Sequence, residues 1–209
     1  MCARDHTHEP PSTLRALREV LGDLRSVDHA VYAAIAATPT PSLDVPLRRL
    51  STAANYSRIW LAIAALLALV GGRTGRRAAF TGAASIGVTS AAVNLGLKGV
   101  GRRRPDREGH GVPEERHVRM PTSTSFPSGH SAAGFAFANA VSAELPLLAL
   151  PLRLLALLVA YSRVHTGVHY PSDAIAGGIV GGVIGQTVAS RAFRRWAPKC
   201  RRAASRKAG

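Results

Sequence analysis

The stretch "SRVHTGVHYPSDAIAGGIVGGVIG", residues 162–185, joins two contrasting kinds of sequence. Its first half carries an arginine, two histidines and an aspartate, and its second half is apolar and rich in glycine. The apolar run "LLALLVAY" (154–161) stands directly before it. Charged and titratable groups cost free energy when they stand beside sequence that is apolar enough to span a membrane. We therefore expect other parts of the chain to supply polar partners for them.

The glycines of this stretch recur every four residues, at Gly177, Gly181 and Gly185. They lie within a predicted last span, Asp173–Ala189. Small residues at this spacing share one face of a helix and allow helices to approach closely in lipid. The row therefore predicts a helix that packs tightly against a neighbour.

Further apolar segments form a series along the chain. The predicted spans are Tyr56–Gly72, Ala78–Leu97, two short spans within residues 131–162, and Asp173–Ala189. A span needs about 20 residues, or roughly 17 at the low end. Each segment alone also fits a buried helix of a soluble protein, but the series favours a membrane. We expect an all-α, integral membrane helical bundle of five to six transmembrane helices.

The N-terminal region predicts an amphipathic helix. Apolar residues recur at helical spacing after the candidate cap Ser12, at Leu14, Leu17, Val20, Leu21 and Leu24. This helix either lies in the membrane interface or packs on other helices. The next apolar segment, "AVYAAIAAT" (30–38), is short and is followed by Pro39 and Pro41. Five spans place the N-terminus outside the cell, and a sixth that includes residues 30–38 places it inside.

Basic residues orient the predicted bundle. The segment "RTGRR" (73–77), Arg153 in the predicted turn, and the tail 191–209 with its eight Lys and Arg all fall on one side. The positive-inside rule makes that side cytoplasmic and indicates a multi-pass protein of the plasma membrane. The loop Lys98–Ser128 then lies outside, although it carries seven Lys and Arg. These outer cations need a function of their own.

The composition narrows the classes of partner. The chain has 27 Lys and Arg against 12 Asp and Glu, a formal net charge of +15, which indicates a polyanionic partner. Aromatic residues make up 5%, so a base-stacking nucleic-acid site is not expected. Cys2 and Cys200 stand at opposite ends without CxxC spacing, which argues against a disulfide framework or a zinc site. The first 20 residues lack the pattern of a secretory signal.

Three polar groups flank the outer loop and the junction of the last two spans. They are "KGVGRRRP" (98–105), "SFPSGHS" (125–131) and "SRVHTGVHYPSD" (162–173). With alternating spans, each group stands at a span end on the same outer face. We therefore expect the three groups to meet one another there.

These residues resemble the signature of the type 2 phosphatidic acid phosphatase (PAP2) superfamily, which includes lipid phosphate phosphatases and vanadium haloperoxidases. The family pattern is K-x6-RP, then PSGH, then SR-x5-H-x3-D. The second part is complete at residues 127–130, and the third is complete from Ser162 to Asp173. In the first part, five residues separate Lys98 from Arg104, one fewer than in the pattern. The resemblance covers about residues 56–190.

The resemblance implies a membrane-embedded, metal-independent phosphatase without a cofactor. It would hydrolyse a lipid phosphate monoester or diphosphate at the outer face, with the lipid phosphate substrate and membrane lipids as its partners. Its catalytic residues would be the nucleophile His169, its partner Asp173 and the acid His130, and phosphate would bind at Lys98, Arg104, Ser128, Gly129 and Arg163. Residues 51–190 would form this domain, preceded by a polar N-terminal region (1–50) and followed by a basic cytoplasmic tail (191–209).

The chemistry of the residue types supports these roles. A histidine can attack phosphorus when another group holds its far nitrogen, and His169 and Asp173, four apart, would share one face of a helix. His130 can protonate the departing oxygen. The basic residues Arg163, Arg104 and Lys98 can neutralise the phosphate. Ser128 and the amide of Gly129 stand at a predicted helix start, where backbone donors favour an anion.

Alternatives stay open on sequence grounds. Asp173 is also a candidate N-cap of the last span. The missing residue turns Lys98 by about 100° relative to Arg104 on a helix, so Arg102 or Arg103 can take its place. His165 lies off the pattern and is expected to be structural or to line the pocket. The alternative functions are a vanadate-dependent haloperoxidase and a non-catalytic basic membrane adaptor. The sequence specifies neither the lipid nor the oligomeric state.

Overall fold

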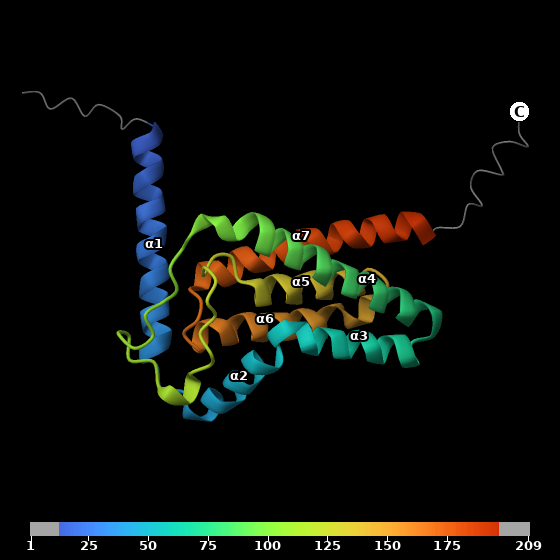
Figure 1. Ribbon diagram of the computed structural model, residues 1–209, viewed down its shortest axis with the longest axis horizontal. Coiled ribbons are helices and arrows are strands. Elements are labelled where there is room, and N and C mark those ends of the chain that lie inside the picture. Colours follow the sequence, from blue (N-terminus) through green and yellow to red (C-terminus); the bar gives the residue numbers. More distant parts are fainter. Residues whose placement is uncertain (1–12, 197–209) are drawn as a thin grey trace, which may run out of the picture.

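The computed structural model describes residues 13–196, and all regular elements between these residues are helical (Figure 1). The main helices are α1 (Thr13–Ala37), α2 (Pro41–Ala53), α3 (Arg58–Val70), α4 (Gly72–Ala91), α5 (Gly129–Ser142), α6 (Ala149–His165) and α7 (Pro171–Trp196). Short helical segments stand at Asn55–Ser57, Ala92–Gly96, Leu97–Val100, Glu114–Arg116 and Pro146–Leu148. The predicted all-α class is confirmed. Ser12, both cysteines and the tail after Trp196 lie outside the described residues.

Helix α5 is the centre of the bundle and lies among α4, α6 and α7 (Figure 1). Its small residues allow this, because Ala132, Ala136 and Ala140 are completely buried. Phe137 fills the space towards α3, where its ring centroid lies 5.6 Å from that of Trp60. The core is therefore built by close helix contacts around α5 more than by large side chains.

The glycine row of α7 packs directly on α5. A methyl group added at Gly177, Gly181 or Gly185 would collide with the backbone carbonyls of Ser128, Ala132 and Ala136, respectively. The matched four-residue spacing on the two helices confirms the close approach predicted from the sequence. It also fixes the start of α7 against the start of α5, where two of the motifs stand.

Two predicted connections differ from those in the structure: the first is shorter, and the second lies earlier in the chain. The segment 73–77 is not a loop but the first turns of α4, which begins at Gly72. Gly72 has a φ of +59°, a left-handed conformation that reverses the chain within two residues, so the helix resumes at once. Arg153 likewise lies inside α6, and the turn before it covers residues 143–148. Both turns and the end of α7 stand at one end of the bundle, opposite the motifs (Figure 1).

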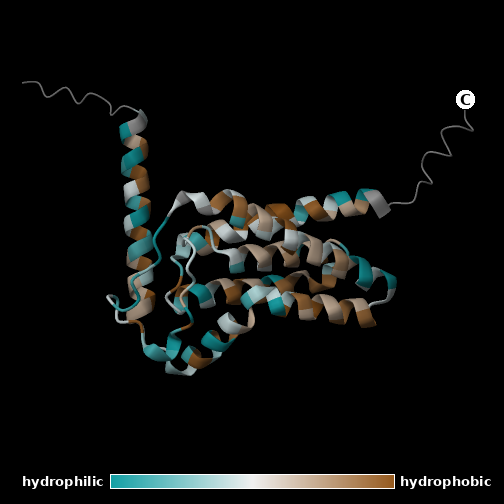
Figure 2. Ribbon diagram, in the orientation of Figure 1, coloured by the Kyte–Doolittle hydropathy of each residue, from teal (hydrophilic) through white to brown (hydrophobic). Residues whose placement is uncertain are grey.

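The apolar helices support a membrane protein, whereas the number of spans stays a prediction. Among the described residues, Gly72–Gly96 and Pro146–His165 are long and apolar enough to cross a membrane. A third candidate is the pair Pro41–Ala53 and Asn55–Val70, which is bent by 65°. Figure 2 shows the apolar character of α3 and α6. The predicted span at Tyr56–Gly72 corresponds to α3, whose 13 residues extend only about 20 Å.

The predicted amphipathic helix and the apolar segment 30–38 form one continuous helix, α1. This helix stands across the motif-bearing end of the bundle (Figure 1). Its apolar residues Leu17, Leu21 and Leu24 are exposed, but Tyr32 is buried against the bundle. The C-terminal half of α1 therefore belongs to the structure that surrounds the motifs.

Candidate active site

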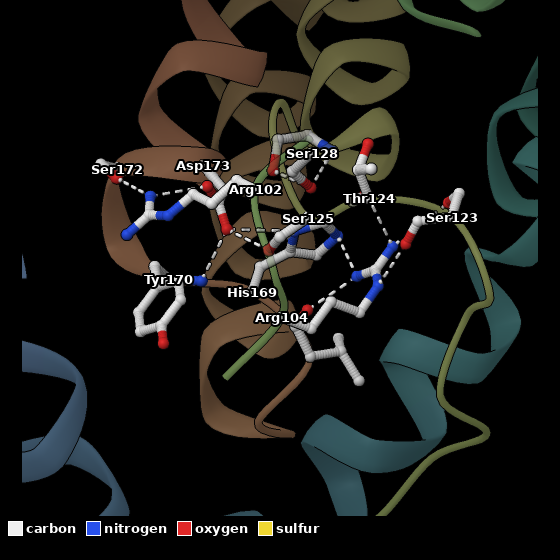
Figure 3. Close-up of polar contacts among 12 residues, drawn as sticks. Arg102, Arg104, Ser123, Thr124, Ser125, Ser128, His169, Tyr170, Ser172 and Asp173 are labelled. Atoms are coloured by element: carbon white, nitrogen blue, oxygen red, sulfur yellow. Dashed lines mark hydrogen bonds and ion pairs between the residues drawn. The ribbon is translucent and has the colours of Figure 1, made fainter. Parts of the chain in front are cut away.

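The three sequence motifs meet at one end of the bundle, as predicted (Figure 3). Two backbone hydrogen bonds join them. The amide of Ser128 donates to the carbonyl of Asp173 at 2.9 Å, and the amide of Ser125 donates to the carbonyl of Arg102 at 2.9 Å. The site is thus held by main-chain contacts, and its side chains start from fixed positions.

His169 and Asp173 form a pair, but not on one helix as the sequence indicated. His169 lies in the connection between α6 and α7, and α7 begins two residues later at Pro171. Gly167, with a φ of +71°, turns the chain back after α6. His169 Nδ1 then lies 3.5 Å from Oδ2 of Asp173, and both side chains are buried. His169 and Asp173 therefore pair across the start of α7 and not along one face of a helix.

The partners of His169 indicate which ring nitrogen carries the proton. Nε2 lies 3.2 Å from a guanidinium nitrogen of Arg104, which can only donate, so Nε2 holds the lone pair. The proton of the neutral ring is then on Nδ1 and points towards Asp173 and Ser125. Burial lowers the pKa of His169 to about 4, although the hydrogen bond to Asp173 opposes this shift. The imidazole is therefore neutral at neutral pH, with its lone pair on Nε2, directed towards Arg104.

Both carboxylate oxygens of Asp173 have polar partners. Its carboxylate accepts hydrogen bonds from the hydroxyl of Ser125 and, at 2.9 Å, from the amide of Tyr170, and it lies 2.8 Å from Arg102. The bond to Tyr170 is that of a residue at the third position of a helix, which reaches back to cap the helix start. The N-cap position is Tyr170, so the prediction of Asp173 as the N-cap residue is wrong. From the third helical position Asp173 both caps the helix start and pairs with His169.

Arg104 lies across His169 and is anchored to the loop. Its guanidinium donates to the carbonyl of Ser123 at 2.9 Å and to that of Val168 at 2.7 Å. Burial lowers the pKa of Arg104, and the negative charge of Asp173 opposes this. Because the side chain is positioned by carbonyl groups, its positive charge is already in place beside Nε2 before an anion arrives.

Arg163 is a second buried cation near His169. It is 2% exposed, and one guanidinium nitrogen donates to the hydroxyl of Ser51 at 2.6 Å. Its Nε has no hydrogen-bond partner among the described residues. The positive charge of Arg163 contributes to the low pKa of His169. A buried guanidinium with an unpaired donor fits an anion site.

The PSGH motif forms the start of α5. Ser128 is the N-cap residue, and its hydroxyl accepts from the amide of Ser131 at 3.4 Å. Gly129 is the first helical residue, so its amide stands at the positive end of the helix. His130 Nε2 lies 2.9 Å from Oδ1 of Asn55, an acceptor, so this nitrogen carries a proton. The motif thus offers amide donors and one protonated imidazole nitrogen.

Lys98 stands in the short helical segment Leu97–Val100, and its side chain is outside the described part of the structure. On sequence grounds, Arg102 was a candidate to take the place of Lys98 in binding phosphate. The structure gives Arg102 another role. Its guanidinium contacts Asp173 at 2.8 Å and Asp28 of α1 at 2.5 Å. Asp28 also accepts from the amide and hydroxyl of Ser172. Arg102 therefore links α1 to the carboxylate that orients His169.

Sequence reasoning missed Asp28 and Ser125 as parts of the site. Ser125 stands in a quoted motif, beside the PSGH residues, and that adjacency was a usable signal. Asp28 had no such signal, because it is one charged residue among many on α1. His165 proves structural, as expected: its Nε2 lies 2.9 Å from Thr40 Oγ1 and 3.2 Å from Asp44.

Comparison with known proteins identifies the family. A sequence model of the PAP2 superfamily matches residues 78–197. The chain belongs to the PAP2 superfamily. It is 33% identical over 141 residues to decaprenylphosphoryl-5-phosphoribose phosphatase of Mycobacterium tuberculosis, covering 66% of this chain and 73% of the relative. The phosphatase of the same name from Mycolicibacterium smegmatis is 33% identical over 152 residues, or 71% of this chain and 77% of the relative.

A solved structure shares the fold. The transmembrane PAP2-type phosphatidylglycerolphosphate phosphatase of Bacillus subtilis superposes with a TM-score of 0.65 at 20% identity, over 85% of this chain and 89% of that chain. Together these similarities confirm the predicted superfamily and the predicted enzyme class, a phosphatase.

The first motif gives a test of the phosphate site. We expect Arg104→Ala to lower kcat/KM by about 10²–10³-fold, the range for losing one preorganised donor to a developing anion. Lys98→Ala should cost less than about ten-fold, because its shortened spacing places it less well. Both variants are compared on one lipid phosphate at matched expression. An equal or larger loss at Lys98 would mean that Lys98 is a main phosphate ligand, and no loss at either would remove this motif from the site.

Proposed function

We propose that this PAP2 protein is a membrane-embedded, metal-independent phosphatase that hydrolyses a lipid phosphate monoester or diphosphate through a phosphohistidine at His169. The arrangement around His169 carries the proposal. Its Nε2 holds a lone pair beside the guanidinium of Arg104, and its Nδ1 side faces the buried carboxylate of Asp173. A neutral imidazole with its far nitrogen held by a carboxylate is an activated nucleophile.

In the first step, Nε2 of His169 attacks phosphorus and the bond from phosphorus to the ester oxygen breaks. His130, protonated on both ring nitrogens before this step, gives one proton to that oxygen, which leaves as an alcohol or, from a diphosphate, as a phosphate. The imidazole gains a positive charge, which the carboxylate of Asp173 stabilises through Nδ1–H. In the second step, water attacks phosphorus, His130 takes a proton from the water, and the phosphorus–nitrogen bond breaks to restore neutral His169.

Protein cations supply the electrostatic stabilisation in this scheme. Arg104 and Arg163 bring two positive charges to the buried site. The backbone amide of Gly129 adds a hydrogen-bond donor at the positive end of α5. Among the described residues, no group of three or more His, Cys, Asp or Glu side chains is arranged to hold a metal ion. In this proposal Arg104 and Arg163 supply the positive charge that a metal ion would otherwise supply.

The relatives support a lipid-linked substrate. The mycobacterial proteins are named for decaprenylphosphoryl-5-phosphoribose and the Bacillus protein for phosphatidylglycerolphosphate. The exposed apolar side chains of the bundle provide a surface for lipid tails, for example at Leu61, Leu95 and Leu158. We place the protein in the plasma membrane, with the site on the outer face and the basic end in the cytoplasm.

The proposal is tested with the purified protein in detergent against a panel of lipid phosphates and diphosphates. We expect phosphate release that persists in excess EDTA, because protein side chains supply the positive charge. Vanadate should inhibit, since it can adopt the five-coordinate geometry of the transition state. Strict dependence on Mg²⁺, or release from none of the lipid substrates, would contradict the proposed function.

A further inference from the structure

We propose that Asp28 of α1 is a positioning residue for the reaction: it holds and neutralises Arg102, the cation beside the catalytic carboxylate. The negative charge of Asp173 thereby stays available to the imidazolium of His169. Asp28 precedes residues 78–197, which match the superfamily model, so it joins the site from outside the matched part of the chain. This inference rests on the proposed function, because the imidazolium forms only in that reaction.

Asp28 is buried, and both of its carboxylate oxygens have partners. Its Oδ2 lies 2.5 Å from a guanidinium nitrogen of Arg102 and accepts from the hydroxyl of Ser172 at 2.7 Å. Its Oδ1 accepts from the backbone amide of Ser172, in the first turn of α7, at 2.8 Å. One carboxylate of α1 thus fixes both Arg102 and the start of the helix that carries Asp173.

Arg102 is held between two carboxylates. One guanidinium nitrogen faces Asp28, and the other lies 2.8 Å from Oδ1 of Asp173. Figure 3 shows Arg102 beside Asp173. The guanidinium carbon lies 4.1 Å from the centroid of the Tyr170 ring. Arg102 therefore contacts Asp173 through Oδ1, whereas His169 lies against Oδ2.

The charges of this row explain how an arginine can touch the catalytic carboxylate without cancelling it. By themselves, Arg102 and Asp173 form a neutral pair, which stabilises a positive charge on His169 only weakly. Asp28 adds a second carboxylate, so two negative charges and one positive charge leave one negative charge in the row. These charges act strongly on one another because a buried site contains little water to screen them.

The reaction needs this negative charge because other neighbours of His169 are cations. The positive charges of Arg104 and Arg163 oppose a charge on the imidazole, and Asp173 favours it. In the proposed first step the imidazole becomes positively charged, so a negative charge at Asp173 stabilises the transition state. A third cation without a carboxylate of its own would therefore slow this step.

The test compares Asp28→Asn, Arg102→Gln and the double variant on one lipid phosphate, with the full-length protein in detergent. Asp28→Asn keeps the size of the side chain and one acceptor oxygen but removes the charge. We expect it to lower kcat by about 10- to 100-fold, the range for losing one charge-assisted contact, with KM changed by less than about three-fold. The double variant again has one net negative charge in the row, so its kcat should equal or exceed that of Arg102→Gln.

The double variant distinguishes this role from a purely structural one. If Asp28 only anchored α1 to the start of α7, its loss would be felt with or without Arg102, and the two losses would multiply. Asp23→Asn is the matched control, because Asp23 is an exposed aspartate of the same helix, and its kcat should stay at the wild-type value. Thermal unfolding midpoints are measured for all variants. The comparison of the double variant with Arg102→Gln stands even where Asp28→Asn is not recovered folded.

The outcomes separate the inference from the proposed function. A double variant at least as active as Arg102→Gln, with Asp23→Asn unchanged, supports the inference. Multiplied losses, a double variant that does not fold, an Asp28→Asn variant with wild-type kcat or with a change in KM alone, or an equal loss in Asp23→Asn would overturn it while leaving a phosphatase. No phosphate release by the wild-type protein from any lipid of the panel would contradict the proposed function itself.

Discussion

Replacing His169 with alanine is expected to lower kcat/KM by at least about 10⁴-fold, because losing a nucleophile removes the covalent route entirely. The remaining side chains can still bind the phosphate, so KM should change far less than kcat. The rate of phosphate release from one lipid phosphate is the measurement. A residual rate within about 100-fold of wild type would show that His169 is not the nucleophile.

The loss must be separated from misfolding, because the His169 side chain is buried. The thermal unfolding midpoint in detergent and the yield from the membrane fraction provide this check. His110→Ala is the matched control, since His110 lies in the loop and contacts a backbone carbonyl at 2.7 Å. We expect near-wild-type activity and stability for that variant.

The second large effect is expected at Asp173. Asp173→Asn should lower kcat by about 10³–10⁴-fold, the size seen when the carboxylate that orients a catalytic histidine becomes an amide. An asparagine can still accept the capping bond from Tyr170, so the start of α7 is kept. The amide oxygen then stands in the place of Oδ2, which also faces Nδ1 of His169, but a neutral amide cannot balance the positive charge that forms on His169.

Arg102 provides the comparison for this variant. Arg102→Gln breaks the ion pair between Arg102 and Asp173 but leaves the carboxylate in place. The variant should therefore lose no more than about 30-fold in kcat, or roughly 2 kcal/mol. Rates and thermal midpoints of both variants are measured together. Equal losses of kcat in Asp173→Asn and Arg102→Gln would show that the ion pair, and not the orientation of His169, is what the site requires from Asp173.

The parts of the site that the sequence predicted are those with fixed local spacing. His169, Asp173 and Ser128 meet because they stand next to helix starts, and the glycines of α7 allow those starts to touch. The helical pattern of the apolar segments predicted the all-α class. Each motif and each apolar repeat consists of residues close together in the chain, so its spacing is directly visible, although the motifs themselves meet through the long-range packing of α7 on α5.

The parts that the sequence did not predict depend on long-range packing. Asp28 reaches Arg102 only because α1 crosses the end of the bundle, which no local pattern of α1 specifies. Asn55 meets His130 across 75 positions of sequence. The start of α4 was misplaced because the left-handed Gly72 compresses the turn, and a glycine pair by itself does not specify its dihedral angles. Tertiary structure determines all three features: the position of Asp28, the position of Asn55 and the start of α4.

The most direct test of the central claim is capture of the phosphorylated histidine. The purified protein is mixed with a substrate labelled in its phosphate, quenched within milliseconds in alkali, and digested with trypsin. Phosphohistidine survives alkali and is lost in acid, so both quenches are compared. The peptide 164–191 contains His165 and His169, and the peptide 120–153 contains His130. We expect alkali-stable label on the first peptide, assigned to His169 by fragmentation and absent from His169→Ala. Label on His130 or His165, or no label during turnover, would contradict the account.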